Sequence, residues 1–74
     1  MGPRDWSFFR DWYAGRKFGE YAVKTGQAPQ LIATHETVLK AVPNSRASNL
    51  SLAYLYEAIG ETKRAQEVWA RIGR

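Results

Sequence analysis

The sequence contains no cysteine and a single histidine, His35. Without cysteine the chain forms no disulfide and no thiolate metal site. The lone histidine follows no metal-binding or nucleophile pattern, and the seven carboxylates are scattered along the chain. We therefore expect no enzymatic activity, no cofactor and no metal site. For His35 we expect a packed or half-exposed side chain.

Long hydrophobic runs are also missing. No apolar stretch approaches the roughly 20 residues that cross a bilayer. Asp5, Arg10 and Asp11 interrupt the apolar residues near the N-terminus, which is not typical of a signal peptide. We expect no membrane span and a cytoplasmic location.

Basic residues are in mild excess, with 11 Lys and Arg against 7 Asp and Glu, a net charge of +4 and a pI of about 9.8. Such a balance permits binding to nucleic acid or to an acidic protein, or is simply a solvated surface. The densest basic group is in the last predicted helix: Lys63, Arg64, Arg71 and Arg74. Nucleic-acid binding by a basic helical protein is therefore the alternative function.

Three short breaks divide an otherwise helical pattern: "TGQAP" at 25–29, "VPNS" at 42–45 and "IGET" at 59–62. Glycine suits the end of a helix, and proline stops one or begins the next. The breaks predict an all-α fold of antiparallel hairpins. The helices are expected at 5–25, 28–41, 45–59 and 61–72. The first segment is either one helix or two, with Gly15 as a candidate bend.

The sequence around Gly26 matches the sequence around Gly60, 34 residues later, in residue size at most positions. The aligned pairs are Phe18 and Leu52, Gly19 and Ala53, Ala22 and Tyr56, Leu31 and Ala65, His35 and Trp69, and Val38 and Ile72. A small and a large residue exchange places in the pairs Ala22/Tyr56 and Leu31/Ala65. A helix–turn–helix unit of this period resembles the tetratricopeptide repeat family. Leu52, Ala53, Tyr56, Gly60, Ala65 and Trp69 match the family pattern in the later unit, and Phe18, Gly19, Gly26 and Pro43 match it in the earlier one.

The resemblance divides the single domain (1–74) into an aromatic N-terminal extension (1–11), a first repeat (12–45) and a truncated second repeat (46–74). The sequence departs from the family pattern at four positions. Gly15 and Asn49 stand where each repeat has a leading aromatic residue, and Leu31 and His35 stand where the first repeat should have a small residue and an aromatic. A helical bundle without repeats is the alternative fold. A small residue at position 19 should let the two helices of the first hairpin approach, with Leu31 and His35 as its neighbours.

The resemblance implies a protein-binding adaptor, scaffold or assembly factor, whose groove holds a peptide or helix of a partner. The residues expected in this groove are Tyr13, Arg16, Lys17, Glu20, Val23, Lys24, Asn44, Leu50, Ser51, Tyr54 and Glu57. The basic members would attract an acidic ligand. The alternative is that they are solvated charges, with Glu20 paired to Arg16 or Lys24.

Aromatic residues crowd the N-terminus at Trp6, Phe8, Phe9 and Trp12, next to Tyr13. One helix face cannot cover so much apolar surface. Two interpretations remain open: these residues cap the first repeat, or they form an interface with another chain. Two repeats are also fewer than a stable stack usually needs. We therefore expect the chain to form a homo-oligomer or to join a larger complex.

Overall fold

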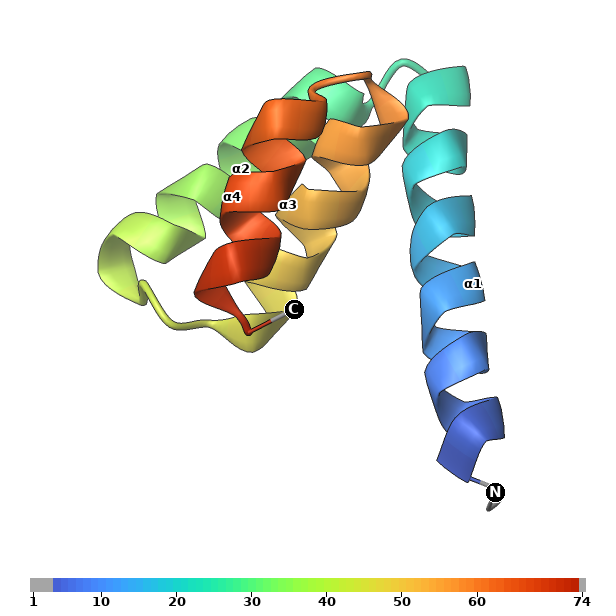
Figure 1. Ribbon diagram of the computed structural model, residues 1–74. Coiled ribbons are helices and arrows are strands. Elements are labelled where there is room, and N and C mark those ends of the chain that lie inside the picture. The colour runs from blue at the N-terminus through green and yellow to red at the C-terminus, as the bar shows by residue number, and fades with distance from the viewer. Residues whose placement is uncertain (1–3, 74) are drawn as a thin grey trace.

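The computed structural model describes residues 4–73, and the side chains of residues 13–73. The described residues form four helices, α1 (Arg4–Lys24), α2 (Ala28–Ala41), α3 (Arg46–Ala58) and α4 (Thr62–Arg71) (Figure 1). This confirms the predicted all-α fold of helical hairpins, and the helix ends lie within about one residue of those expected from the sequence.

The first helix is continuous, so Gly15 does not divide it. The backbone of the predicted N-terminal extension therefore runs directly into the helix of the first repeat. The side chains of Trp6, Phe8, Phe9 and Trp12 lie outside the described side chains, and their predicted role as a cap or an interface stays a prediction.

The turns after α1 and α3 have the same hydrogen-bond pattern. Gly26 and Gly60 adopt φ angles of +75° and +86°, which are accessible to glycine at little cost. After α1, the Gln27 amide donates to the Ala22 carbonyl (2.8 Å) and the Gly26 amide to Val23 (3.1 Å). After α3, the Glu61 amide donates to Tyr56 (2.8 Å) and the Gly60 amide to Glu57 (3.2 Å). Both are Schellman motifs, and the helix end predicted at each glycine is confirmed.

The starts of α2 and α3 also follow from local chemistry. Pro29 lies in the first turn of α2. Backbone N–H groups in a first turn have no partner within the helix, so proline, which lacks one, costs no hydrogen bond there. Ser45 is the N-cap of α3, and its hydroxyl accepts a hydrogen bond from the Ser48 amide at 3.3 Å.

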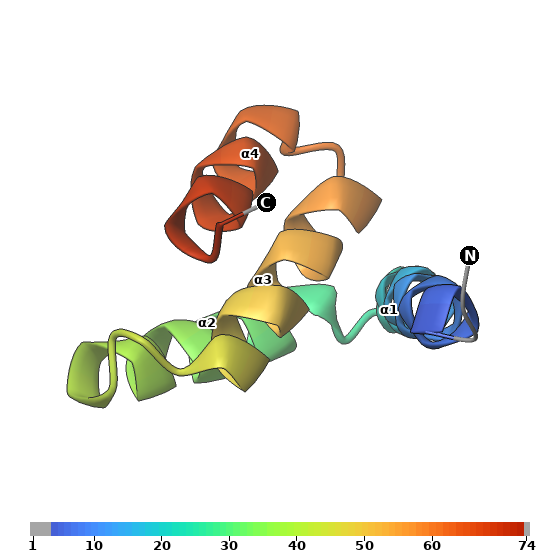
Figure 2. The same cartoon turned by 60° about the horizontal axis from the view of Figure 1, so that its bottom comes forward.

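Helix α3 lies at the centre of the fold and packs against each of the other three helices. Figure 2 shows α1 on one side of it and α2 and α4 towards the other. A helix covered on several sides is apolar nearly all round, and five consecutive residues of α3 are buried: Leu52, Ala53, Tyr54, Leu55 and Tyr56.

Two apolar clusters form on this central helix. Leu55, Ala22 and Ala28 join α3 to the ends of α1 and α2 that meet at the first turn, with Phe18, Leu31 and Ile32 packed against them. The second cluster joins α3 to α4 and to the rest of α2. It consists of Leu52, Ala53, Tyr56, Ala65 and Val68, with Ile32, Leu39 and Trp69 at its edge.

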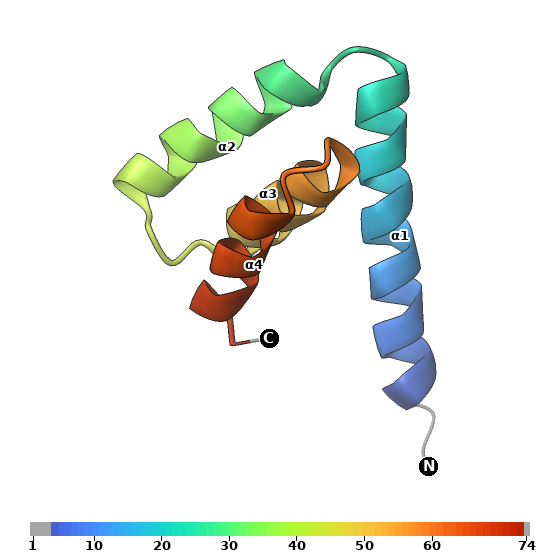
Figure 3. The ribbon, with the colours of Figure 1, turned by 45° about the horizontal axis from the view of Figure 1, so that its top comes forward.

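Helices α1 and α2 diverge from the turn that connects them, and each makes most of its contacts with α3 instead (Figure 3). This corrects the expected surroundings of Gly19. A Cβ atom at position 19 would lie 2.8 Å from the Tyr54 carbonyl oxygen and 3.1 Å from the Ala58 Cβ, both on α3. Gly19 therefore permits close contact between α1 and α3, and Leu31 and His35 are not its neighbours.

No helix in the described part of the chain has the length and apolar character needed to cross a membrane.

Candidate functional site

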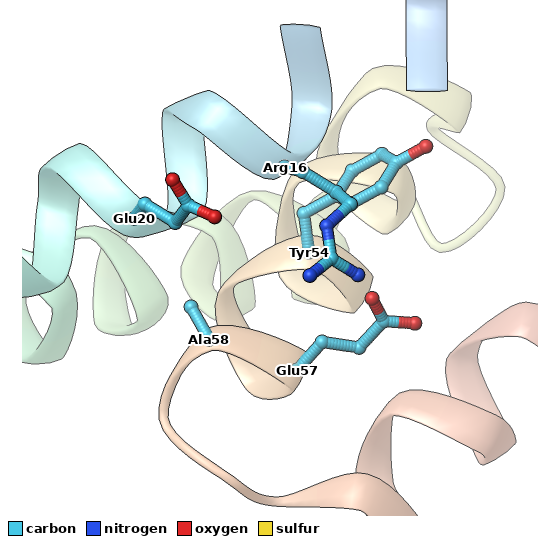
Figure 4. A pocket seen from close by; sticks show the side chains of 5 residues that line it. All are labelled: Arg16, Glu20, Tyr54, Glu57 and Ala58. Carbon is cyan, nitrogen blue, oxygen red and sulfur yellow. The ribbon is translucent and has the colours of Figure 1, made fainter. Parts of the chain in front are cut away.

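A small hollow lies between α1 and α3, and we call it the α1–α3 hollow. Its volume is about 60 Å³, and it is lined by Arg16, Glu20, Tyr54, Glu57 and Ala58. In Figure 4 the side chains of Arg16 and Glu57 point toward each other beside the Tyr54 ring. Arg16, Glu20, Tyr54 and Glu57 all belong to the groove expected from the sequence, so the structure brings these four together.

Tyr54 forms the floor of this hollow and is only 7 % exposed. A Cβ atom at Gly15 would overlap its ring, so glycine at position 15 is what lets α1 lie against Tyr54. On its other side, the ring meets Trp69 edge-on, with centroids 5.1 Å apart and an interplanar angle of 86°. Trp69 in turn donates from Nε1 to Glu57 Oε2 at 2.7 Å. The hollow is thus held in shape by residues of α1, α3 and α4.

The remaining expected groove residues do not line this hollow. Tyr13, Lys17 and Lys24 are exposed on α1, where Lys17 Nζ lies 3.6 Å from Glu20 Oε1 and 5.5 Å from the centroid of the Tyr13 ring. Glu20 thus pairs with Lys17, a pairing that was not predicted from the sequence. Elsewhere, Val23 is exposed, Leu50 and Ser51 are half-buried on α3, and Asn44 lines a separate hollow beside α4.

His35 is half-buried on α2, and its Nδ1 lies 3.2 Å from the Ser48 hydroxyl of α3. This matches the packed or half-exposed side chain expected from the sequence. Among residues 13–73, no three His, Asp or Glu side chains are grouped as ligands for a metal ion.

Asn49 has a structural role that was not predicted from the sequence. It is 2 % exposed, and its Nδ2 donates to the carbonyls of Pro43 (3.3 Å) and Ser45 (2.9 Å). Its Oδ1 accepts from Arg71 Nη2 of α4 at 3.2 Å. Asn49 therefore ties the α2–α3 loop to the end of α4. One indication of this role was present in the sequence: Asn49 is a polar amide at a position where the repeat family has an aromatic residue.

Tyr56 forms a second polar link between helices. Its hydroxyl donates to Glu36 Oε2 of α2 at 2.6 Å, and the guanidinium carbon of Arg64 from α4 lies 5.7 Å from the centroid of its ring. Burial, and then the hydrogen bond to Glu36, raise the pKa of Tyr56 above its ordinary value, and Arg64 opposes this only in part. The phenol therefore stays neutral in the folded state at a pH where it ionises in the unfolded chain.

Tyr56 is expected to make the protein less stable at high pH. The unfolded chain begins to release the Tyr56 proton near pH 10, and the folded chain retains it, so unfolding becomes more favourable as pH rises. The free energy of unfolding should fall by at most about 1.4 kcal/mol per pH unit, until Tyr56 also ionises in the folded state. Urea unfolding of the wild type and of Tyr56→Phe between about pH 8 and pH 11 measures it.

At neutral pH, Tyr56→Phe should cost about 1 kcal/mol, from the lost hydrogen bond. Above pH 10 the variant should lose stability less steeply than the wild type. Tyr21→Phe, at a tyrosine that is 63 % exposed, is the matched control and should keep the wild-type slope. If the free energy of unfolding falls with pH at the same rate in the wild type and in Tyr56→Phe, Tyr56 does not cause the loss of stability.

No protein-family model, curated protein sequence or solved structure matches this chain. The resemblance to tetratricopeptide repeats therefore stays a prediction from the residue pattern.

Proposed function

We propose that this chain is a protein-interaction module of the tetratricopeptide-like type, which holds a helix or peptide of a partner against α1 and α3. It would act as a small adaptor, scaffold or assembly factor. The observation that carries the proposal is the α1–α3 hollow, where Arg16, Glu20 and Glu57 surround the Tyr54 ring.

Similar turns and similar burial at matched positions support the repeat interpretation, although α1 and α2 diverge while α3 and α4 pack together. The turns at Gly26 and Gly60 have equivalent hydrogen bonds. The matched positions 19 and 53 are both buried, and so are positions 22 and 56. Gly19 lies where α3 approaches α1 closely, and Ala22 belongs to the cluster that joins α1, α2 and α3. These likenesses favour two related hairpins over an unrelated bundle.

The size and chemistry of the hollow favour a protein partner. A volume of about 60 Å³ is roughly that of two water molecules, so the hollow suits a single side chain and not a whole small molecule. Tyrosine, tryptophan and arginine are the residues most often found at the energetic centres of protein interfaces. Tyr54 and Arg16 line the hollow, and Trp69 packs against Tyr54. Glu20 already pairs with Lys17, and Glu57 already accepts a hydrogen bond from Trp69. We therefore propose that a partner side chain that accepts a hydrogen bond from the Arg16 guanidinium fits best.

Reversing one charge at the hollow tests this function. Arg16→Glu should place a third carboxylate beside Glu20 and Glu57 and weaken partner binding at least about tenfold. Lys63→Glu is the matched control, because it makes the same charge change at an exposed position of α4 that does not line the hollow. Tagged wild-type and variant proteins are compared by affinity capture and quantitative mass spectrometry.

The expected result is a set of partner proteins that Arg16→Glu loses and Lys63→Glu keeps, with both variants folded by circular dichroism. An identical partner set for all three proteins would show that the hollow does not bind them. Self-association through Trp6, Phe8, Phe9 and Trp12 stays a separate prediction from the sequence.

The basic group predicted in the last helix is described only in part, because Arg74 lies outside the described residues. Lys63, Arg64 and Arg71 are all exposed, and Arg64 lies over the Tyr56 ring while Arg71 donates to Asn49. Nucleic-acid binding gains no support from this arrangement, and it remains the alternative that a direct binding assay decides.

A further inference from the structure

A larger groove lies between α2 and α4. Two adjoining hollows form it, with volumes of about 440 Å³ and 650 Å³, and they share Pro43 and Arg71. Leu52 and Tyr56 of α3 line the first hollow, and Asn49 of α3 lines the second. We call this surface the α2–α4 groove. Its lining includes no residue of α1.

Apolar side chains provide much of its lining. Leu39 and Pro43 lie on the α2 side, Leu52 on the floor and Ile72 after the end of α4. Leu39 and Ile72 are only half-buried, so part of this apolar surface faces solvent. A segment with apolar side chains of its own would remove that surface from water.

The charged side chains along the groove are mostly basic. Lys40, Arg46 and Arg71 line it together with a single carboxylate, Glu36. Glu36 already accepts the hydrogen bond from Tyr56. No ion pair joins Lys40, Arg46 or Arg71 to a carboxylate of residues 13–73. The groove therefore combines an apolar lining with three cations that have no carboxylate partner in the described part of the chain.

We infer that the α2–α4 groove binds an acidic peptide segment that also carries apolar side chains, such as an amphipathic helix of a partner protein. The acidic side chains would lie along Lys40, Arg46 and Arg71, and the apolar ones would cover Leu39, Pro43 and Ile72. This is a second surface, and it does not depend on partner binding at the α1–α3 hollow.

The lining favours such a peptide over nucleic acid. A phosphate backbone presents charge along its whole length and no aliphatic side chains, so it would leave Leu39 and Ile72 uncovered. Nor does an aromatic ring stand open in the groove as a stacking platform for bases, because Tyr56, the aromatic residue that lines it, is 6 % exposed.

Selection from a displayed library of random peptides tests the inference. The peptides should be about 12 residues long, enough for roughly three helical turns. The double variant Lys40→Glu/Arg46→Glu removes two groove cations at exposed positions. Its matched control, Lys24→Glu/Lys63→Glu, makes the same charge change at exposed positions that do not line the groove.

We expect the wild type to enrich peptides that combine Asp or Glu with Leu, Ile or Phe. Fluorescence anisotropy should show them binding at least about tenfold more weakly to Lys40→Glu/Arg46→Glu, a difference of about 1.4 kcal/mol. Binding to the control double variant and to Arg16→Glu should stay close to wild type. Replacing the apolar residues of a selected peptide by serine should also weaken binding.

Three outcomes would overturn the inference. One is a selection that enriches no acidic and apolar peptides. Another is equal binding of such peptides to the groove variant and its control. The third is a random-sequence DNA duplex or single strand that binds the wild type and displaces the peptides, which would assign the groove to nucleic acid. Because Arg16→Glu is included, loss of groove binding can be distinguished from failure of the proposed α1–α3 function.

Discussion

Leu55→Ala is expected to lower the free energy of unfolding by about 2–5 kcal/mol, the usual range for a fully buried leucine. Leu55 is 0 % exposed and contributes to the cluster where α1, α2 and α3 meet. A chain of 74 residues has a total stability of about 4–11 kcal/mol. The loss is therefore a large share of the total, and the variant should unfold at a lower denaturant concentration than the wild type.

Chemical denaturation followed by circular dichroism measures this effect. Leu50→Ala is the matched control, because it makes the same change at a half-buried position of the same helix. It should cost clearly less than Leu55→Ala. Equal losses at the two positions would mean that Leu55 is not the more tightly packed of the two.

Gly19→Leu is expected to have the next largest effect, a loss of about 1–3 kcal/mol through overpacking. Even the Cβ atom would lie 2.8 Å from the Tyr54 carbonyl oxygen, which is held in the central helix. The gain in helix propensity, about 1 kcal/mol, does not offset the displacement of α1 from α3. The same displacement should open the α1–α3 hollow.

Ala14→Leu is the control for Gly19→Leu, since residue 14 is exposed on the same helix. Thermal melting should show a lower Tm for Gly19→Leu and a nearly unchanged Tm for Ala14→Leu. Limited proteolysis adds a local measurement, because α1 should be cleaved faster in the Gly19 variant. An unchanged Tm and cleavage rate would contradict the close α1–α3 contact.

The helices were predictable from the sequence because their ends depend on local chemistry. Gly26 and Gly60 supply the left-handed residue of each turn, and Ser45 supplies a cap. The divergence of α1 and α2 was not predictable, since a short turn fixes where two helices meet and not the angle between them. For the same reason the neighbours of Gly19 were assigned to α2 instead of α3.

The candidate site was predictable in part. The repeat pattern selected the face of α1 and α3 that carries Arg16, Glu20, Tyr54 and Glu57, and these residues do meet. The pattern could not show that Lys24 and Asn44 lie outside the α1–α3 hollow. It indicates which face of a helix a residue is on, but not how far along the helix a groove extends. The link from Tyr56 to Glu36 joins residues 20 positions apart on different helices, and only the packed fold brings them together.

The central position of α3 also has a consequence for the order of assembly. Helices α2, α3 and α4 contact their sequence neighbours, so their packing closes only short loops. Docking α1 onto α3 must close a loop that contains all of α2, and its entropic cost is recovered only after α3 is in place. Helix α1 can therefore dock only after α3 has formed. During synthesis, α1 would leave the ribosome before α3, the helix on which it packs.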